Sequence, residues 1–291
     1  MFQRIAIVGV GLLGGSLGLA IQKRKLAQEV IGIGRNAARL AAARQLRAIT
    51  ADTTDLRAGI AGCDLAIVCT PVERIVETVR QIAQAADRPI LITDVGSTKA
   101  RIVADVEQLC QTTTWPQSAR FVGSHPIAGN EKSGVEHASA ELFTGRAVVV
   151  TPSATTEPAD TDAIVQFWTA LGTHVTILPA DEHDRAMAAV SHLPHLLASA
   201  IAAATPERYL ALCGTGWQDT TRIAAGDAML WRQILQSNQQ HVLASLEQFL
   251  AVADEFAGAL RTGDSARLEQ LLGQAKALRD AVNGGPQRKP D

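Results

Sequence analysis

The sequence predicts two domains: an α/β domain built on a mainly parallel sheet, followed by a domain made of helices alone. Apolar runs of strand length alternate with segments of helical spacing up to Pro179, a pattern typical of βαβ units. From Asp181 onward no strand-like run remains, and apolar residues recur at helical spacing. The length of 291 residues also favours two domains over one. We therefore predict an α/β domain at residues 1–180, a helical domain at 181–282 and a flexible tail at 283–291.

Composition excludes several classes of partner. Hydrophobic residues make up 47% of the chain and charged residues 19%, which is typical of a soluble protein with a sizeable core. The formal net charge of -2 gives no basic footprint for a nucleic acid. The glycine-rich apolar run at residues 5–21 has neither a basic leader nor a small-residue cleavage site. We therefore expect no signal peptide and no membrane partner.

The cysteines indicate a reducing compartment. They lie far apart, without the spacing of a metal site or a redox motif: Cys63, Cys69, Cys110 and Cys213. Free, mostly buried thiols are the expected state, and they are typical of a cytoplasmic protein. No metal site is predicted.

A glycine fingerprint follows the first strand. The apolar run at residues 4–8 is a buried strand, and a helical pattern extends from the glycines to Lys25. Gly9 allows a tight turn, Gly11 lets the backbone approach a pyrophosphate, and Gly14 lets the helix pack closely on the strand. The amino end of the helix then offers free N–H groups to the anion. The predicted dinucleotide loop of this Rossmann-type domain comprises Gly9, Gly11, Leu12, Leu13 and Gly14.

The end of the second strand bears on the choice of cofactor. This strand is expected at residues 29–33, and Gly34, Arg35 and Asn36 follow it. An acidic residue at this point would bind the ribose 2′-hydroxyl of NAD, and none is present. A guanidinium suits a 2′-phosphate, so Arg35 favours NADP over NAD. The alternative is an arginine that stacks on the adenine or faces solvent.

The remaining elements follow from the spacing of apolar residues. Further buried strands are expected at residues 64–71, 89–94, 146–152 and 174–178. Helices are expected at 37–46, 72–86, 163–171, 184–204, 231–261 and 265–279. An alanine-rich helical domain of this size is expected to bury its surplus apolar faces in a homodimer.

Polar residues end two of these strands on the ligand-binding rim. Thr70 and Pro71 close one strand, and Asp94 closes the next. Because ligands bind at the carboxyl ends of the strands in open α/β sheets, we predict that these three residues contact the cofactor. Ser97 lies just beyond, where a serine serves equally well as a helix N-cap or as a functional hydroxyl.

A stretch rich in glycine, residues 123–134, presents the first candidate for acid–base chemistry. His125 precedes Pro126, and a residue before proline adopts extended geometry. We therefore expect a stiff turn that carries the imidazole, with a helical segment beginning at Glu131. Alone, this pattern also fits a turn with an incidental histidine.

Two clusters in the helical half are candidate substrate contacts. His192 and His195 flank Pro194, which predicts a kink. Since no carboxylate or cysteine lies at ligand spacing, hydrogen bonding or substrate contact ranks above metal binding. Arg222 enters a predicted helix from a glycine-containing loop, as anion-clamping arginines do. The alternative is a surface arginine paired with Asp219 or Asp227.

With these stretches together, the chain resembles the prephenate/arogenate dehydrogenases of tyrosine biosynthesis over nearly its whole length. The resemblance rests on ordered motifs: Gly9-x-Gly11-x-x-Gly14-Gly15-Ser16, Asp94-Val95-Gly96-Ser97-Thr98-Lys99, Gly123-Ser124-His125-Pro126 with Glu131-x-Ser133-Gly134, Ser191-His192-Leu193-Pro194-His195, and Asp219-x-x-Arg222 with Trp231. It implies NAD(P)-dependent oxidative decarboxylation of prephenate to 4-hydroxyphenylpyruvate, and a helical domain that dimerises.

The resemblance also implies roles for the candidate residues. His125 is then the catalytic base, and Ser97 positions the hydroxyl or the imidazole. Arg222 holds a substrate carboxylate. The residues implied to bind the substrate or to line or gate its pocket are Ser124, Glu131, His195 and Trp231. Glu131 and His195 favour prephenate over arogenate.

Two other classes share part of this pattern. A different two-domain hydroxy-acid dehydrogenase shares the glycine loop, but such enzymes more often place a catalytic lysine on a helix, and no lysine here is a better candidate than His125. A redox-sensing nucleotide-binding protein needs only the first domain, without Arg222 or the histidines.

Overall fold

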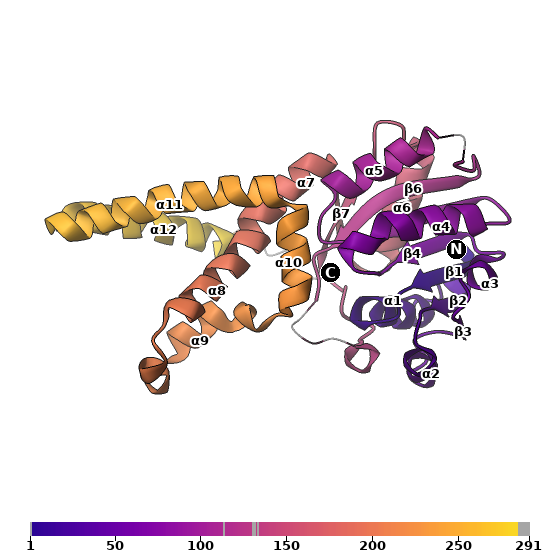
Figure 1. Ribbon diagram of the computed structural model, residues 1–291, viewed down its shortest axis with the longest axis horizontal. Helices are drawn as coiled ribbons and strands as arrows, with labels where there is room; N and C mark the ends of the chain where they lie inside the picture. Colours follow the sequence, from indigo (N-terminus) through magenta and orange to yellow (C-terminus); the bar gives the residue numbers. More distant parts are fainter. Residues whose placement is uncertain (1, 113, 130–131, 133, 285–291) are drawn as a thin grey trace. The chain divides into compact units, whose positions relative to one another are not determined.

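The computed structural model describes residues 2–112, 114–129, 132 and 134–284 (Figure 1). It divides into two compact units, one ending at His241 and the other beginning at Val242. All residues predicted to bind cofactor or substrate belong to the first unit, whose sheet and helices position the site.

The first unit contains an eight-stranded sheet with the order β3-β2-β1-β4-β5-β6-β7-β8. Its strands are β1 (Phe2–Val8), β2 (Ala27–Ile33), β3 (Ala51–Thr53), β4 (Leu65–Val68), β5 (Ile90–Asp94), β6 (Ala119–Pro126), β7 (Ala147–Thr151) and β8 (His174–Ile177). Neighbouring strands are parallel except for the antiparallel pair β6 and β7. The strand order reverses between β1 and β4, which creates a crevice at their carboxyl ends. The predicted Rossmann-type fold is confirmed.

Helices cover both faces of the sheet (Figure 1). They are α1 (Leu12–Lys23), α2 (Ala37–Gln45), α3 (Leu56–Ile60), α4 (Ile75–Ala85), α5 (Ala100–Cys110) and α6 (Pro158–Ala170). One apolar cluster contains Leu17 of α1 and Trp168 of α6, and the other contains Val79 and Ile82 of α4. The sequences of β1 and β4 are almost continuously apolar because one face of each strand is buried in the first cluster and the other face in the second.

The helical half begins directly after β8. Its elements in the first unit are α7 (Ala180–Met187), a π-helical turn (Ala188–His192), α8 (Leu193–Ala204), α9 (Thr215–Thr221), a 3-10 turn (Arg222–Ala225) and α10 (Ala228–Ser237). Helix α11 (Gln239–Thr262) crosses from the first unit into the second, which also contains α12 (Ser265–Gly284). The predicted tail therefore begins later than residue 283, and residues 285–291 lie outside the described part of the chain.

One helical stretch, Ala180–Ala204, is long and apolar enough to cross a membrane by length and composition. It also carries buried polar side chains: His183, Asp184, His192 and His195. Several of these are hydrogen-bonded to the sheet domain or to Asn238. Because ionisable groups inside a bilayer are costly, we interpret this stretch as a helix of the protein interior rather than as a membrane span.

The structure corrects four details of the predicted elements. The short elements β3 and α3 were not predicted, because three to five residues show too little periodicity. His125 lies within β6 rather than in a turn, since β7 pairs with it and holds His125 opposite Val149. The predicted helix at 231–261 breaks at Asn238, whose side chain is buried and hydrogen-bonded. Helix α6 begins at Pro158, before the helix predicted at residues 163–171.

The helical backbone continues through Pro194 without a break. The proline stands in the first turn of α8, where its missing N–H leaves no bond unmade. The π-helical turn just before it absorbs the change in hydrogen-bonding pattern. The four cysteines are free thiols, as predicted, but the prediction that most are buried is wrong: Cys63 is buried, Cys69 and Cys213 are half-buried, and Cys110 is exposed.

Candidate active site

The glycine loop has the geometry of a phosphate cradle. Gly9 has φ +99°, and a Cβ there would lie 2.7 Å from the carbonyl oxygen of Cys69. A Cβ on Gly14 would lie 2.1 Å from the carbonyl oxygen of Gly9, so the helix packs on the loop only with glycine there. Gly11 faces open space and no side chain caps the amino end of α1. Free N–H groups and a helix dipole therefore point at this space, which fits a dinucleotide pyrophosphate.

Two further predicted cofactor contacts adjoin this loop. The hydroxyl of Thr70 follows β4, is shielded from solvent and has no hydrogen-bond partner among the described residues. Pro71 is exposed beside it. An unsatisfied buried hydroxyl is rare in native proteins, so a bound group that completes its hydrogen bonding fits this position. These observations favour a dinucleotide over an empty glycine-rich turn.

Arg35 lies where the cofactor prediction requires it. It is exposed just after the carboxyl end of β2 and forms no ion pair with a described residue. Its neighbour Asn36 caps α2 by accepting from the N–H of Arg39 at 3.0 Å, which fixes the backbone beside Arg35. The guanidinium is thus available to a ligand on the rim.

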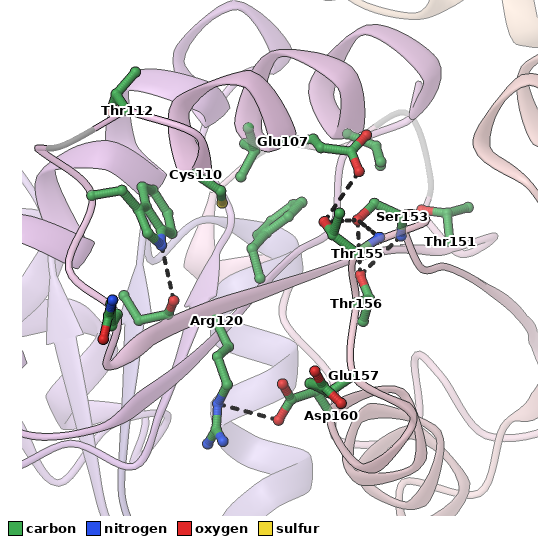
Figure 2. Close-up of a pocket in the computed structure, with 16 residues that line it drawn as sticks. Glu107, Cys110, Thr112, Arg120, Thr151, Ser153, Thr155, Thr156, Glu157 and Asp160 are labelled. Carbon is green, nitrogen blue, oxygen red and sulfur yellow. Dashed lines mark hydrogen bonds and ion pairs between the residues drawn. The ribbon is translucent and has the colours of Figure 1, made fainter.

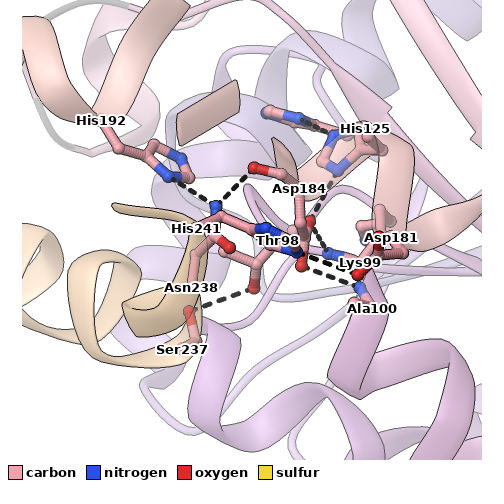
Figure 3. A network of polar contacts seen from close by, with 12 residues as sticks. Thr98, Lys99, Ala100, His125, Asp181, Asp184, His192, Ser237, Asn238 and His241 are labelled. Atoms are coloured by element: carbon pink, nitrogen blue, oxygen red, sulfur yellow. Dashed lines mark hydrogen bonds and ion pairs between the residues drawn. The ribbon is translucent and has the colours of Figure 1, made fainter. Parts of the chain in front are cut away.

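His125 lies at the carboxyl end of β6, on the rim where β1 leads into the glycine loop. The imidazole is buried, and its Nδ1 atom lies 2.8 Å from Nε2 of His183 (Figure 3). Burial lowers the pKa of His125 well below 6.5, and the charges of His183, Lys99 and His192 lower this pKa further. A neutral imidazole on the ligand rim can accept a proton.

His183 connects His125 to the carboxylate of Asp184, whose Oδ1 lies 2.7 Å from Nδ1 of His183. Asp184 also accepts the backbone N–H groups of Lys99 at 2.7 Å and Ala100 at 2.9 Å. It therefore caps the amino end of α5, and the alternative of an N-cap for Ser97 is wrong. Ser97 is half-buried just before this helix.

Asp94 is a correction to the predicted cofactor contacts. Its side chain is fully buried and pairs with the buried ammonium of Lys99. It also accepts the N–H of Gly96 at 2.8 Å and the N–H of Ser124 at 3.2 Å. Because protein donors occupy the carboxylate, it is positioned to link β5 with α5 and β6, and we do not retain it as a cofactor ligand.

Ser124 is a second correction. The side chain is fully buried, and its hydroxyl donates to the carbonyl oxygen of Asp94 at 2.7 Å. Nε1 of Trp168 donates to the same hydroxyl at 3.0 Å, and Thr93 Oγ1 lies 2.8 Å away. A serine hydroxyl offers one donor and two acceptor sites, so these partners saturate it. Ser124 holds β6 to its neighbours, and the predicted substrate contact is not supported.

Two histidines of the helical half, His192 and His195, face Trp231. The ring of His195 stacks on Trp231 with centroids 3.5 Å apart, and His192 meets the same indole edge-on at 6.3 Å. Nδ1 of His195 is buried without a partner among the described residues. Nδ2 of Asn238 lies 3.1 Å from Nδ1 of His192 and donates to the carbonyl oxygen of Asp184 at 2.7 Å. Asn238 thereby joins this cluster to the residues around His125.

A cavity of about 430 Å³ opens beside the stacked rings of His195 and Trp231. Ser199, Ala224 and Gly226 also line it. The cavity is of a size for a small organic ligand.

Arg222 is not brought into this cavity. It begins the 3-10 turn that follows α9 and is exposed, so it does not enter a helix from a loop as predicted. It forms no ion pair with Asp219, Asp227 or any other described residue, which argues against the surface-pair alternative. Glu131 itself lies outside the described residues, and the described segment after it contains a short 3-10 helix, Val135–His137, in place of the helix predicted to begin at Glu131.

A second cavity, of about 600 Å³, lies away from all these residues (Figure 2). Its walls come from α5, the start of β6, and the loop from β7 into α6, with Arg120 paired to Asp160 at 3.2 Å. Since β6 and β7 are antiparallel, the end of β7 lies by the start of β6, at the rim opposite His125. Cavity size alone therefore does not identify the predicted site.

Comparison with known proteins places the chain in a family. A family model described as the nucleotide-binding domain of prephenate dehydrogenase matches residues 17–177, and one described as its dimerization domain matches residues 179–274. The chain belongs to the prephenate dehydrogenase family. A prephenate dehydrogenase of Lactococcus lactis is 33% identical, covering 96% of this chain and 77% of its own. The cyclohexadienyl dehydrogenase of Zymomonas mobilis is 28% identical, covering 97% of each chain.

Solved structures agree. The crystal structure of prephenate dehydrogenase from A. aeolicus in complex with hydroxyphenyl propionate and NAD+ has a TM-score of 0.88 to this chain. The two are 29% identical, and the match covers 97% of this chain and 99% of the other. As a member of this family the protein is an oxidoreductase with a nicotinamide cofactor, as predicted from the sequence.

Membership of the prephenate dehydrogenase family also supports a homodimer, because the helical half matches a dimerization domain. The helices α11 and α12 carry exposed apolar side chains: Leu243, Phe249, Leu250, Val252, Leu260, Leu272 and Leu278. Apolar surface of this extent is typical of a subunit interface.

Sequence reasoning missed the residues that support His125. His183, Asp184 and Asn238 contact it directly or through one another, yet they are distant in sequence and follow no motif. Helix α7 also carries Asp181, Glu182 and Arg185, so no pattern in its sequence singles out His183 and Asp184 as the buried pair.

Proposed function

We propose that this protein oxidises prephenate with a nicotinamide cofactor and releases 4-hydroxyphenylpyruvate and CO2. The observation that carries the proposal is His125: a buried, neutral imidazole on the same rim of the sheet as the glycine loop. The family supports it, because relatives covering nearly the whole chain are named prephenate dehydrogenase.

The reaction requires one base, a carboxylate contact and a site that excludes water. The cofactor, when bound, accepts the hydride from C4 of the ring. His125 takes the proton of the 4-hydroxyl as that hydride leaves. Departure of the ring carboxylate as CO2 returns its electrons to the ring, which becomes aromatic, and the C4 oxygen recovers its proton. His125 thus acts as base and then as acid at one oxygen. Ser97 is the residue proposed to orient this hydroxyl.

The substrate side chain is proposed to meet the helical half. The stacked pair of His195 and Trp231 gives the cavity one flat wall. The pyruvyl group of prephenate combines a keto oxygen with a carboxylate, and Arg222 is proposed to hold a carboxylate. Its lack of an ion-pair partner within the described residues leaves the guanidinium available.

For the cofactor we propose NADP, on the basis of Arg35. The guanidinium is exposed at the end of β2, where NAD-binding proteins of this fold carry an acid. The crystal structure from A. aeolicus contains NAD+, so NAD is the alternative. With no membrane or nucleic-acid partner expected, we propose a cytoplasmic enzyme.

Turnover assays test the proposal. Purified protein is incubated with prephenate or arogenate, each with NADP or NAD, while the absorbance of the reduced cofactor is recorded. The proposal expects the highest kcat/KM with prephenate and NADP, and 4-hydroxyphenylpyruvate by mass spectrometry. The second candidate is arogenate dehydrogenase or dual specificity, which the cyclohexadienyl dehydrogenase relative favours; it expects tyrosine from arogenate. No reduction with either substrate would refute both.

A further inference from the structure

The ring of His183 joins His125 to a buried carboxylate (Figure 3). We propose that His183 and Asp184 are positioning residues that hold His125 with its hydrogen on Nδ1, so that Nε2 is free to accept a proton from the substrate. This inference rests on the function proposed above for His125. It follows from counting donors and acceptors along the chain of contacts from Asp184 to His125.

The count begins at Asp184, whose carboxylate faces two backbone N–H donors and one ring nitrogen of His183. Its Oδ1 accepts the N–H of Lys99 at 2.7 Å and its Oδ2 accepts the N–H of Ala100 at 2.9 Å. Oδ1 also lies 2.7 Å from Nδ1 of His183. A protonated Oδ1 could donate only to Nδ1 of His183, and it would then lose strength as an acceptor for the backbone N–H of Lys99, whereas hydrogen bonds donated to a carboxylate favour its charged form. Asp184 is therefore ionised, and Nδ1 of His183 carries the hydrogen of their bond.

The next step fixes the contact between the two rings. A neutral histidine with hydrogen on Nδ1 has only a lone pair on Nε2. The 2.8 Å contact between Nε2 of His183 and Nδ1 of His125 then requires the hydrogen to come from His125. The rings meet edge-on, with planes 73° apart, so a hydrogen in the plane of one ring can point at the other. Nε2 of His125 is left unprotonated.

The alternative is a doubly protonated His183, which would donate to His125 and move the hydrogen of His125 to Nε2. His183 is fully buried, and the ammonium of Lys99 is buried nearby. A second buried cation beside Lys99 would have to be stabilised by Asp184, which already accepts two backbone N–H groups. The other titratable groups acting on His125 are Lys99 and His192, and both disfavour a further positive charge here.

The arrangement also assists the reaction. When His125 accepts the substrate proton at Nε2, the imidazolium keeps its Nδ1 hydrogen directed at His183. That hydrogen bond becomes charge-assisted and stronger, and the negative charge of Asp184 lies one ring beyond. No proton has to leave Nδ1. His183 and Asp184 therefore direct the base and stabilise its charged form without touching the substrate.

Nitrogen NMR tests the hydrogen position directly. Protein labelled with 15N at histidine distinguishes protonated from unprotonated ring nitrogens through their two-bond couplings to carbon-bound ring hydrogens. The signals of His125 are assigned by their loss in the His125→Asn variant. At neutral pH we expect a protonated Nδ1 and an unprotonated Nε2 in the unaltered protein. A protonated Nε2 would overturn the proposal, whichever substrate the enzyme uses.

Variants test the direction of the chain. Asp184→Asn can present an amide donor to Nδ1 of His183, which reverses both hydrogen bonds and places the hydrogen of His125 on Nε2. We expect kcat to fall by about 10²–10⁴-fold, the range for loss of a general base, with a KM change of less than about threefold. His183→Leu should also lower kcat, whereas His183→Gln retains an acceptor for His125 and should restore much of the loss.

A matched control and a folding check complete the design. His174→Asn alters an exposed histidine at the start of β8 and should leave kcat and the His125 signals unchanged. Thermal unfolding and cofactor titration show whether each variant folds. If Asp184→Asn does not fold, the His183→Gln and His183→Leu pair and the spectrum of the unaltered protein still decide. Equal kcat for Asp184→Asn and the unaltered enzyme would contradict the proposal. If Nε2 of His125 is unprotonated but the unaltered protein turns over neither prephenate nor arogenate, the proposed function is refuted and the proposed hydrogen position stands.

Discussion

Trp231 lies flat against His195, with ring centroids 3.5 Å apart and planes only 9° from parallel. Gly226 makes this stack possible, because a Cβ at that position would lie 2.6 Å from Nε1 of Trp231 and 3.1 Å from Cε1 of His195. The backbone of Gly226 is extended, with φ −63° and ψ 155°, so any residue tolerates its conformation. The glycine is therefore required by the space that the two rings occupy.

Gly226→Ala is expected to displace the stack and to weaken substrate binding. Overpacking of this kind costs about 1–3 kcal/mol, which corresponds to roughly a 5- to 150-fold loss in kcat/KM. We expect most of the loss in KM for prephenate and no change in cofactor affinity. Gly214→Ala is the control, since a Cβ there meets nothing within 4 Å. Steady-state kinetics with an unaltered KM in Gly226→Ala would show that the stack lies outside the substrate site.

Arg35→Ala tests the choice of cofactor. If the guanidinium binds the 2′-phosphate, its loss removes a charge-assisted contact of about 1.5–3 kcal/mol. The affinity for NADP should then fall by roughly 10- to 150-fold, while NAD affinity changes little. Arg39→Ala, on the neighbouring helix α2, is a charge-matched control. Fluorescence titration of each cofactor measures both. Equal losses for NADP and NAD, or an unaltered enzyme that strongly prefers NAD, would exclude this role for Arg35.

Arg222→Lys tests the proposed carboxylate contact. Lysine keeps the positive charge but loses the planar guanidinium, which binds a carboxylate through two hydrogen bonds. We expect KM for prephenate to rise by about tenfold or more, with unchanged cofactor affinity. The measurement is initial rate against prephenate concentration, with Arg80→Lys, at the exposed face of α4, as the matched surface control. A normal KM in Arg222→Lys would assign Arg222 to the surface.

The sequence allowed the cofactor loop to be predicted because its requirements are local. The tight turn at Gly9 and the close packing at Gly14 involve residues near in sequence or in the adjacent strand. The surroundings of His125 are different. The proline after His125 predicted extended geometry correctly, but only pairing with β7 decides that the residue lies in a strand. His183 lies 58 residues from His125 along the chain, so no spacing rule links the two.

Ser124 and Asp94 were predicted to contact a ligand, but both side chains are fully buried and bonded to other protein groups. Asp94 was predicted to contact the cofactor because it ends a strand on the ligand rim, whereas the substrate contact of Ser124 was implied by the family resemblance. The same rim also contains polar groups that join the strands to each other and to α5. The buried carboxylate of Asp94 forms an ion pair with Lys99 and accepts the N–H of Ser124. Position in the sheet therefore predicts the neighbourhood of a side chain, whereas its burial depends on partners that the sequence does not reveal.

His125→Asn tests the proposed base. Asparagine retains hydrogen bonding but cannot accept the proton, so kcat should fall by about 10²–10⁴-fold while KM changes far less. In the unaltered enzyme the base must be neutral, and burial holds the pKa of His125 well below 6.5. Activity should therefore be constant down to about pH 6.5 and fall only below it. The pH profile of kcat measures this limb, which should be absent in the variant. A variant that keeps both rate and limb would show that the proton leaves through another group.

His192 should make the stability of the fold depend on pH. Burial lowers the pKa of His192 to about 4. Nδ2 of Asn238 lies 3.1 Å from Nδ1 of His192, so a proton on that Nδ1 would point at the N–H of Asn238, which is also a donor. In the unfolded chain the pKa of a histidine is about 6.5. Between these values the unfolded state binds a proton that the folded state does not, so the free energy of unfolding falls as the pH drops from about 6.5 to about 4.

The expected contribution of His192 over that interval is about 3 kcal/mol, from 1.36 kcal/mol for each pKa unit. Urea unfolding is followed at pH 7.5 and pH 4.5 at one protomer concentration, because a dimer gains stability with concentration. His192→Asn removes this titration, so its stability should change less between the two pH values than that of the unaltered protein. The exposed-histidine variant His174→Asn should retain the full change. The same pH dependence in all three proteins would show that His192 is protonated equally in the folded and unfolded states.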